Sequence, residues 1–220
     1  MRGISGPAPG AGPGTRGAWG VVVVVLLVGV HLVRAGTAEY RAGGPPRPLP
    51  AAAHGHVAAA TPVRAPAPLP ASPPERLRVP AARIDAPVTD VGLDAGRWIA
   101  TPPAYEKNLV GWFTGSVTPG AQGTAVLVGH VDTPDGKAVF FELGSLTRER
   151  RIEITRADGR TAVFSVYGVE TVPKENFPAT RIYRATGHPE LRLITCGGSF
   201  SPEKGYDGNV VVSARLVAVR

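Results

Sequence analysis

The sequence has a single cysteine among 220 residues, so no disulfide bond can form within the chain. Aromatic residues are also scarce, at 6% of the chain, and no stretch of basic residues is interleaved with them. Such a stretch is typical of nucleic-acid-binding proteins, and its absence argues against a nucleic-acid partner. The net charge is +7, but six basic and only two acidic residues lie within residues 1–75. The rest of the chain is therefore only mildly basic.

The longest apolar run covers residues 18–33, with one histidine as its only polar side chain. Its length is at the lower limit for a membrane-spanning helix, which needs roughly 17 to 25 residues. Arginines precede the run, and Arg34 follows it at once. We predict a transmembrane signal anchor at 18–34 with a cytoplasmic tail at 1–17, because basic residues favour the cytoplasmic side. The alternative is a signal peptide cleaved near the small residues that end at Ala38.

Residues 35–75 are rich in proline and alanine and contain almost no aromatic residues. Such a segment cannot bury enough surface to offset the entropy of ordering it. We therefore predict a disordered stalk, which an extended polyproline conformation would make long. The sequence thus predicts a single-pass protein of the cell membrane, with residues 76–220 forming an extracellular domain.

The pattern of residues 76–220 differs, because short apolar or alternating runs recur between turn signals. No long segment has a 3.6-residue period, but short helical turns are expected near 139–146 and 180–184. Asp158-Gly159, between two of the runs, indicates a β-hairpin. This pattern predicts an all-β domain of seven or eight strands, and a closed barrel would leave no open edges. The predicted strands are Leu77–Val79, Ala82–Ile84, Thr124–Val128, Arg151–Thr155, Ala162–Tyr167, Leu191–Thr195 and Val210–Ala214.

The lone cysteine, Cys196, follows one of these strands and precedes Gly197 and Gly198. A strand end is a rigid mount, and glycines allow another backbone to approach closely. One interpretation is a small buried apolar side chain. The other is a reactive thiol, which needs a base or a cation nearby because its free pKa is about 8.5.

His130 is the candidate base, because it follows Gly129 at the end of another apolar strand. The ends of two strands that are distant in sequence can meet at one end of a barrel. A histidine that only satisfies a turn is the alternative interpretation. His188, in a polar turn before the cysteine strand, is the weaker candidate.

Two motifs resemble those of the sortases, namely LVGHVD at 127–132 and LITCGG at 193–198. The Cys-Gly-Gly sequence and the segment DGNVVV at 207–212 are most similar to class F sortases of high-GC Gram-positive bacteria. The similarity extends over about residues 77 to 217.

This resemblance implies an eight-stranded β-barrel and a cysteine transpeptidase without a cofactor. The enzyme would cleave an LPxTG-type sorting signal near the C-terminus of a secreted protein. Cys196 matches the nucleophile, His130 matches the acid/base, and Thr195 would help to position the substrate. The acceptor would be an amine of a cell-wall precursor or of a pilin lysine.

The resemblance also implies an arginine on the last strand that stabilises the tetrahedral intermediate, but Asn209 stands where that arginine is expected. Arg215 lies six residues further along, about 20 Å in an extended strand, and so cannot share the site with Asn209. We therefore predict that Asn209 or backbone amides near Gly197 donate to the oxyanion. Arg181 is the leading candidate if a charge is required.

Two other functions are compatible with these residues. A hydrolytic cysteine peptidase would form the same thioester and transfer it to water. A surface-displayed binding module would carry the thiol without using it. No metal site is predicted, since Asp132 and Asp135 near His130 are interpreted as turn residues rather than as calcium ligands.

Overall fold

The structure is a computed structural model that describes residues 43–49 and 66–220. The predicted cytoplasmic tail and anchor, 1–17 and 18–34, lie outside the described residues, as does most of the predicted stalk. Within the described ranges, none of the helices has the length and apolarity needed to cross a membrane.

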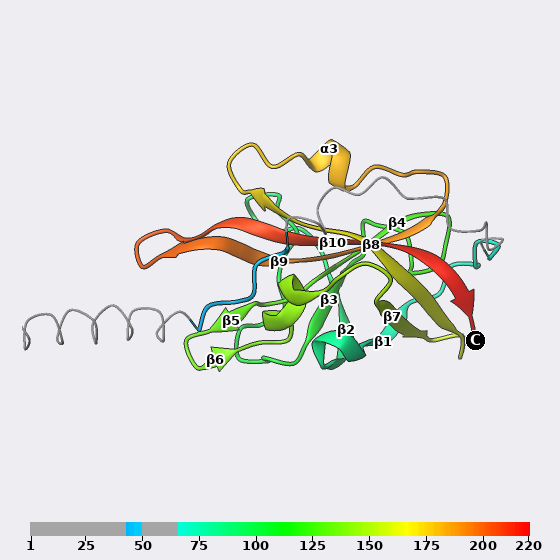
Figure 1. Ribbon diagram of the computed structural model, residues 1–220. Helices are drawn as coiled ribbons and strands as arrows, with labels where there is room; N and C mark the ends of the chain where they lie inside the picture. The colour runs from blue at the N-terminus through cyan, green and yellow to red at the C-terminus, as the bar shows by residue number, and fades with distance from the viewer. Residues whose placement is uncertain (1–42, 50–65) are drawn as a thin grey trace, which may run out of the picture. The chain divides into compact units, whose positions relative to one another are not determined.

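Eight strands close into a barrel in the spatial order β1-β2-β3-β4-β9-β10-β8-β7 (Figure 1). The prediction of a closed, eight-stranded all-β barrel is therefore confirmed. A small hairpin of β5 (Asp132–Thr133) and β6 (Gly136–Lys137) forms a separate sheet. The barrel strands are β1 (Pro74–Val79), β2 (Ile84–Val91), β3 (Val110–Phe113), β4 (Gly123–Val128), β7 (Arg151–Arg156), β8 (Thr161–Pro173), β9 (Pro189–Ser201) and β10 (Gly205–Val219).

Three short helices connect the strands within the described residues: η1 (Pro80–Ala82), η2 (Phe141–Ser145) and α3 (Ala179–Ile182). The two helical turns expected from sequence correspond to η2 and α3. The strand expected from Ala82 instead begins at Ile84, because Pro80 starts η1 and Arg83 then adopts a left-handed conformation, with φ of 54°. Sequence reasoning also missed β3, a four-residue strand without alternation.

Strand β4 is buried along its whole length, which explains its continuous apolar sequence. Ala125 and Leu127 belong to the barrel core. Val126 and Val128 belong to a second apolar cluster, which includes Ile182 of α3. Strand β4 is thus covered on both faces.

The chain enters the barrel through an ordered segment, which corrects the prediction of a disordered stalk as far as residue 75. Leu69 packs against the core, and its N–H donates to the carbonyl of Gly120 at 2.8 Å. The guanidinium of Arg156 is fully buried and donates to the carbonyls of Pro119 and of Pro70, the latter at 2.6 Å. Buried carbonyls and a buried cation satisfy each other here, and this interaction orders a segment whose own composition does not predict order.

A second part of the predicted stalk also packs on the barrel unit. The carbonyl of Pro46 lies so close to Gly144 of η2 that any β-carbon at this position would collide with it. The guanidinium of Arg47 lies 3.4 Å from the hydroxyl of Ser199. Residues 46 and 47, within the predicted stalk, thus lie against η2 and β9.

The buried Arg156 leads to a prediction for stability. Arg156→Met should lower the free energy of unfolding by about 2–5 kcal/mol, because it leaves the carbonyls of Pro70 and Pro119 without their buried donor and each unsatisfied buried group costs about 1–3 kcal/mol. Urea denaturation measures the change. Arg160→Met is the matched control: Arg160 also pairs with Asp158, at 3.2 Å, but its side chain is 44% exposed. A surface pair contributes about 0–1 kcal/mol, so equal losses in the two variants would contradict this interpretation.

The carboxylate of Asp158 should make this stabilisation dependent on pH. Its hydrogen bond with Arg156 holds the pKa of Asp158 below the usual value, although burial opposes the shift. A lowered pKa in the folded state means that the stabilisation is present above the unfolded-state pKa and is lost as the pH falls through the folded-state pKa. Asp158→Asn should therefore be less stable than wild type at pH 7, and the difference should vanish in strong acid. Urea denaturation over a series of pH values tests this, and a constant difference would refute it.

Candidate functional site

The parallel pairing of β4 with β9 brings His130 and Cys196 to the same edge of the barrel. Val128 pairs with Ile194 at the end of this register, and each candidate residue lies two positions further along its strand. The contact between the two segments continues past the end of β4, because the Thr195 hydroxyl donates to the carbonyl of Gly129 at 2.8 Å. The buried Thr195 therefore joins the two segments that carry His130 and Cys196.

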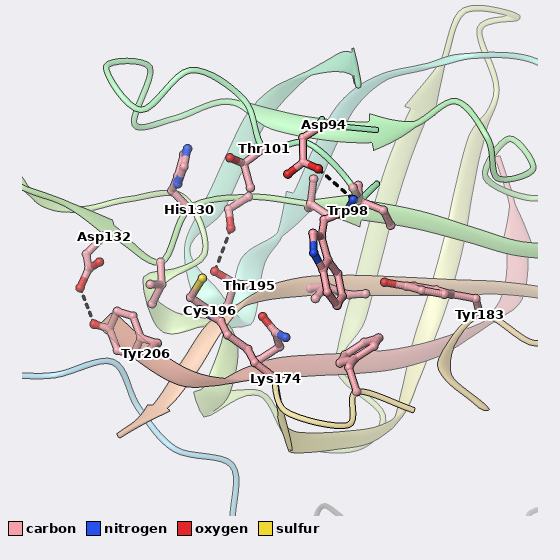
Figure 2. A pocket seen from close by; sticks show the side chains of 17 residues that line it. Asp94, Trp98, Thr101, His130, Asp132, Lys174, Tyr183, Thr195, Cys196 and Tyr206 are labelled. Carbon is pink, nitrogen blue, oxygen red and sulfur yellow. Dashed lines mark hydrogen bonds between the residues drawn. The ribbon is translucent and has the colours of Figure 1, made fainter. Parts of the chain in front are cut away.

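Both residues line one pocket of about 490 Å³ (Figure 2). Thr195 and Asn209 line it as well. Its apolar wall is formed by Trp98, Ile99, Val128, Phe177, Tyr183 and Ile194. The pocket therefore combines a thiol and an imidazole with an apolar surface that suits an extended peptide with apolar side chains.

The two glycines after Cys196 are required by the bend of the β9–β10 hairpin. A β-carbon at Gly197 would lie 2.6 Å from Val210 Cγ2. Gly198 has a φ of +91°, and a β-carbon there would collide with the Asp207 carboxylate. That carboxylate accepts a hydrogen bond from the N–H of Ser199 at 2.7 Å. The glycines thus allow the irregular pairing with β10 that follows the half-buried thiol, before the hairpin turns at 202–204.

Gly129 has a comparable role before His130. A β-carbon at Gly129 would lie 2.8 Å from the ring of Phe140 and 2.9 Å from Val139. The N–H of Phe140 donates to the carbonyl of His130 at 3.0 Å. The backbone that carries the imidazole is therefore held against the segment leading into η2.

The imidazole of His130 is turned away from the thiol of Cys196 (Figure 2). Its Nε2 lies 2.7 Å from the carbonyl oxygen of Pro102. A carbonyl only accepts hydrogen bonds, so Nε2 carries the proton in this arrangement. In enzymes without substrate, the catalytic hydrogen bonds are often formed only when substrate binds. Rotation of this side chain would release the carbonyl of Pro102.

A carboxylate and a phenol close the end of the pocket next to His130. The hydroxyl of Tyr206 donates to Asp132 at 2.5 Å, which joins the β9–β10 hairpin to β5. Burial and then the neighbouring carboxylate raise the pKa of Tyr206. Phe200 packs against the Tyr206 ring, with 5.1 Å between centroids. The hydrogen bond between Tyr206 and Asp132 therefore connects the two chain segments that follow His130 and Cys196.

Comparison with models of protein families identifies the family to which this barrel domain belongs. The model of the sortase domain matches residues 77–217, which is more than half of the chain. The chain belongs to the sortase family. Membership implies a cysteine transpeptidase whose substrates are cell-surface proteins with sorting signals. No curated protein sequence matches this sortase.

Solved sortase structures share the fold at low sequence identity. The SrtA sortase of Actinomyces oris is 22% identical, with a TM-score of 0.52, over 71% of this chain and 88% of that one. Sortase A of Corynebacterium diphtheriae is 21% identical, with a TM-score of 0.51, over 67% and 62%. Sortase C1 of Streptococcus agalactiae is 18% identical, with a TM-score of 0.51, over 66% and 67%. At these identities the likeness concerns the fold alone.

The structure separates the candidates for the third site residue of this sortase. Asn209 pairs with Cys196 across β9 and β10 and lines the pocket. Arg181, the leading arginine from sequence, does not line it. Its guanidinium instead binds both carboxylate oxygens of Glu170, at 2.7 and 2.9 Å. In this structure a carboxylate therefore engages the arginine away from the thiol.

The remaining candidates lie elsewhere on the barrel. Arg215 pairs with Glu190, six positions along β10 from Asn209, as the strand geometry required. His188 immediately precedes β9 and accepts a hydrogen bond from the N–H of Gly123 at 3.3 Å. It is therefore at the opposite end of the β4–β9 pair from Cys196.

Sequence reasoning missed several residues that line the pocket, among them Asp94, Trp98, Lys174 and Tyr206. Tyr206 directly precedes the DGNVVV segment, which is a weak local signal. Asp94, Trp98 and Lys174 lie on connections between strands and carry no signal in the sequence. In the described part of the chain, no three histidine, cysteine or acidic side chains gather as in a metal site.

The hydrogen bond between Tyr206 and Asp132 leads to a prediction for dynamics. Tyr206→Phe should speed amide hydrogen exchange in residues 131–137 by about tenfold or more, because a hydrogen bond to a charged group contributes about 1.5–3 kcal/mol. Hydrogen-exchange mass spectrometry measures this. Tyr105→Phe is the matched control, since Tyr105 is 80% exposed and forms no bond with Asp132. Unchanged protection in Tyr206→Phe would show that the bond does not hold this segment.

Proposed function

We propose that this sortase cleaves an LPxTG-type sorting signal of secreted proteins and transfers them to an amine. The observation that carries the proposal is the thiol of Cys196 at the end of an apolar pocket that His130 also lines. The apolar wall, with Trp98 and Ile99 on one connection and Phe177 on another, suits the leucine and proline of such a signal.

In the first half-reaction, the thiolate of Cys196 attacks the carbonyl carbon of the threonine in the signal. The carbonyl electron pair moves to oxygen, and a tetrahedral oxyanion forms. When this intermediate collapses, the bond between threonine and glycine breaks and the protonated His130 gives its proton to the leaving amine. The product is a thioester between Cys196 and the threonine.

In the second half-reaction, an amine of a cell-wall precursor or of a pilin attacks the thioester carbonyl. His130 accepts the proton of this amine, a new amide bond forms, and Cys196 leaves as the thiolate. Both half-reactions require the imidazole to leave the carbonyl of Pro102, to which it is bonded at 2.7 Å. Substrate that enters beside the Thr101–Pro102 connection is the proposed trigger for this rotation.

The class and the location of the enzyme are part of the proposal. The Cys-Gly-Gly sequence and the DGNVVV segment support a place among the class F sortases. The apolar run at 18–33, with Arg34 directly after it, supports a single-pass anchor at 18–34 in the cell membrane, with the barrel outside the cell. An extracellular barrel would meet its substrates as they leave the membrane.

Mass spectrometry of the protein after incubation with an LPxTG peptide tests the chemistry. We expect a mass increase at Cys196 equal to that of the peptide fragment that ends in threonine less one water, because the acyl group replaces the thiol hydrogen. Cys196→Ala should give no adduct and no cleavage, and His130→Ala should slow cleavage by about 100- to 10,000-fold, because it removes the general acid. Both variants should keep the wild-type circular dichroism spectrum.

The fate of the acyl group distinguishes transfer from hydrolysis. With a glycine-based amine added, the product should carry this amine. Release of the free acid at an unchanged rate, whatever the amine, would instead identify a hydrolytic peptidase. Wild-type turnover by Cys196→Ala would refute the mechanism.

A further inference from the structure

The pocket has one permanent positive charge, on Lys174, which is the only lysine or arginine among its lining residues. The acidic side chains of the pocket are already engaged. Asp94 accepts a hydrogen bond from the N–H of Trp98 at 2.9 Å, and Asp132 accepts one from Tyr206. In the described ranges, the ammonium of Lys174 forms no ion pair or side-chain hydrogen bond. It is therefore available to a ligand.

The backbone of Lys174 is held firmly, although its side chain is exposed. Its N–H donates to the carbonyl of Asp207 at 2.9 Å, and its carbonyl accepts from the N–H of Phe177 at 3.3 Å. Asp207 belongs to the hairpin that carries Cys196. The lysine is thus mounted directly on the element that bears the nucleophile.

The register of three strands places this lysine relative to the thiol. Cys196 pairs with Asn209, and Asn209 pairs with Val172, so the three residues form a row across β9, β10 and β8. Lys174 lies two positions beyond Val172, one residue past the end of β8, and it lines the same pocket as Cys196. Its α-carbon is then about 10 Å across and about 7 Å along from that of Cys196.

The lysine stem, the cysteine side chain and one hydrogen bond can together span this separation. In Figure 2, Cys196 and Lys174 lie on the same side of the pocket, facing the side that carries Thr101 and Asp94. The four-carbon stem of lysine is flexible and ends in three donors, which suits an oxygen whose charge appears only during the reaction.

We propose that Lys174 stabilises the oxyanion of the tetrahedral intermediate, in place of an arginine on the last strand. The inference rests on the proposed acyl transfer. When the thiolate attacks, the carbonyl electron pair moves to oxygen, and the ammonium donates a hydrogen bond to it without giving up its proton. On collapse, the pair returns to carbon and His130 protonates the leaving amine.

Asn209 alone does not supply this charge. Its amide stands opposite Cys196 and is a neutral donor, whereas a charged donor in a partly desolvated site stabilises an oxyanion more strongly. The other basic candidates are excluded by position, because Arg181 binds Glu170 and Arg215 lies further along β10. Lys174 and Asn209 thus form a pair of donors on neighbouring strands.

The test measures acylation of Cys196 by an LPxTG peptide in three variants. Lys174→Met removes the charge and keeps the stem, and it should slow acylation by about 100- to 1000-fold. Lys174→Arg keeps a charged donor and should retain more activity than Lys174→Met. Lys204→Met is the matched control. It removes the same charge from the exposed turn between β9 and β10, and Lys204 does not line the pocket. Acylation by the control should stay at the wild-type rate.

Alkylation of Cys196 by iodoacetamide separates two roles for the charge. This reaction forms no oxyanion, so an oxyanion donor leaves its rate and pH profile unchanged in Lys174→Met. A shifted pH profile of alkylation would show that Lys174 acts on the thiol instead, which would overturn the proposal. Equal acylation by Lys174→Met and wild type would also overturn it.

A p-nitrophenyl ester keeps this inference distinct from the proposed substrate. The ester acylates a thiol through a tetrahedral oxyanion without any sorting signal. If the LPxTG peptide does not acylate Cys196 of the wild-type protein, the proposed substrate is wrong. The ester then decides the role of Lys174: slower acylation of Lys174→Met supports it, and an equal rate refutes it.

Discussion

The parallel pairing of β4 with β9 is the interaction on which the site depends. Antiparallel neighbours would send the ends of these strands to opposite edges of the barrel. The observed register, with Val128 opposite Ile194, instead brings His130 and Cys196 to one edge. The bond from the Thr195 hydroxyl to Gly129 extends the pairing to the residues next to the reactive groups. The two segments that carry the site are therefore fixed to each other by the pairing at the centre of the barrel.

At this edge of the barrel, glycines and a hydrogen bond hold the segment after His130 close to the segment after Cys196. Gly129 and Gly197 stand where a β-carbon would collide with Phe140 or Val210. The bond between Tyr206 and Asp132 then ties the hairpin after Cys196 to the segment after His130. Close backbone approach and one charged hydrogen bond together hold the two segments beside the thiol.

Much of the domain could be predicted from local sequence, but its exceptions have physical causes. The alternating runs and the Asp158-Gly159 turn indicated the hairpin of β7 and β8 that the structure contains. Strand β3 was missed because four residues without alternation give no period to detect. The stalk was expected to be disordered as far as residue 75, yet the buried guanidinium of Arg156 orders its last part by binding Pro70. That interaction joins residues 86 positions apart, and no local pattern reports it.

The sequence by itself determined the class of fold and the family, and it singled out Cys196 and His130 as candidates, because these depend on short contiguous motifs and strand periodicity. Only the tertiary structure decided which side chains surround the thiol. It placed Asn209 opposite Cys196, engaged Arg181 with Glu170 and brought Lys174 into the pocket from the end of β8. It also showed His130 bonded to the carbonyl of Pro102. These neighbours come from different strands and connections, and their proximity follows from barrel closure and register, which the order of residues along the chain does not reveal.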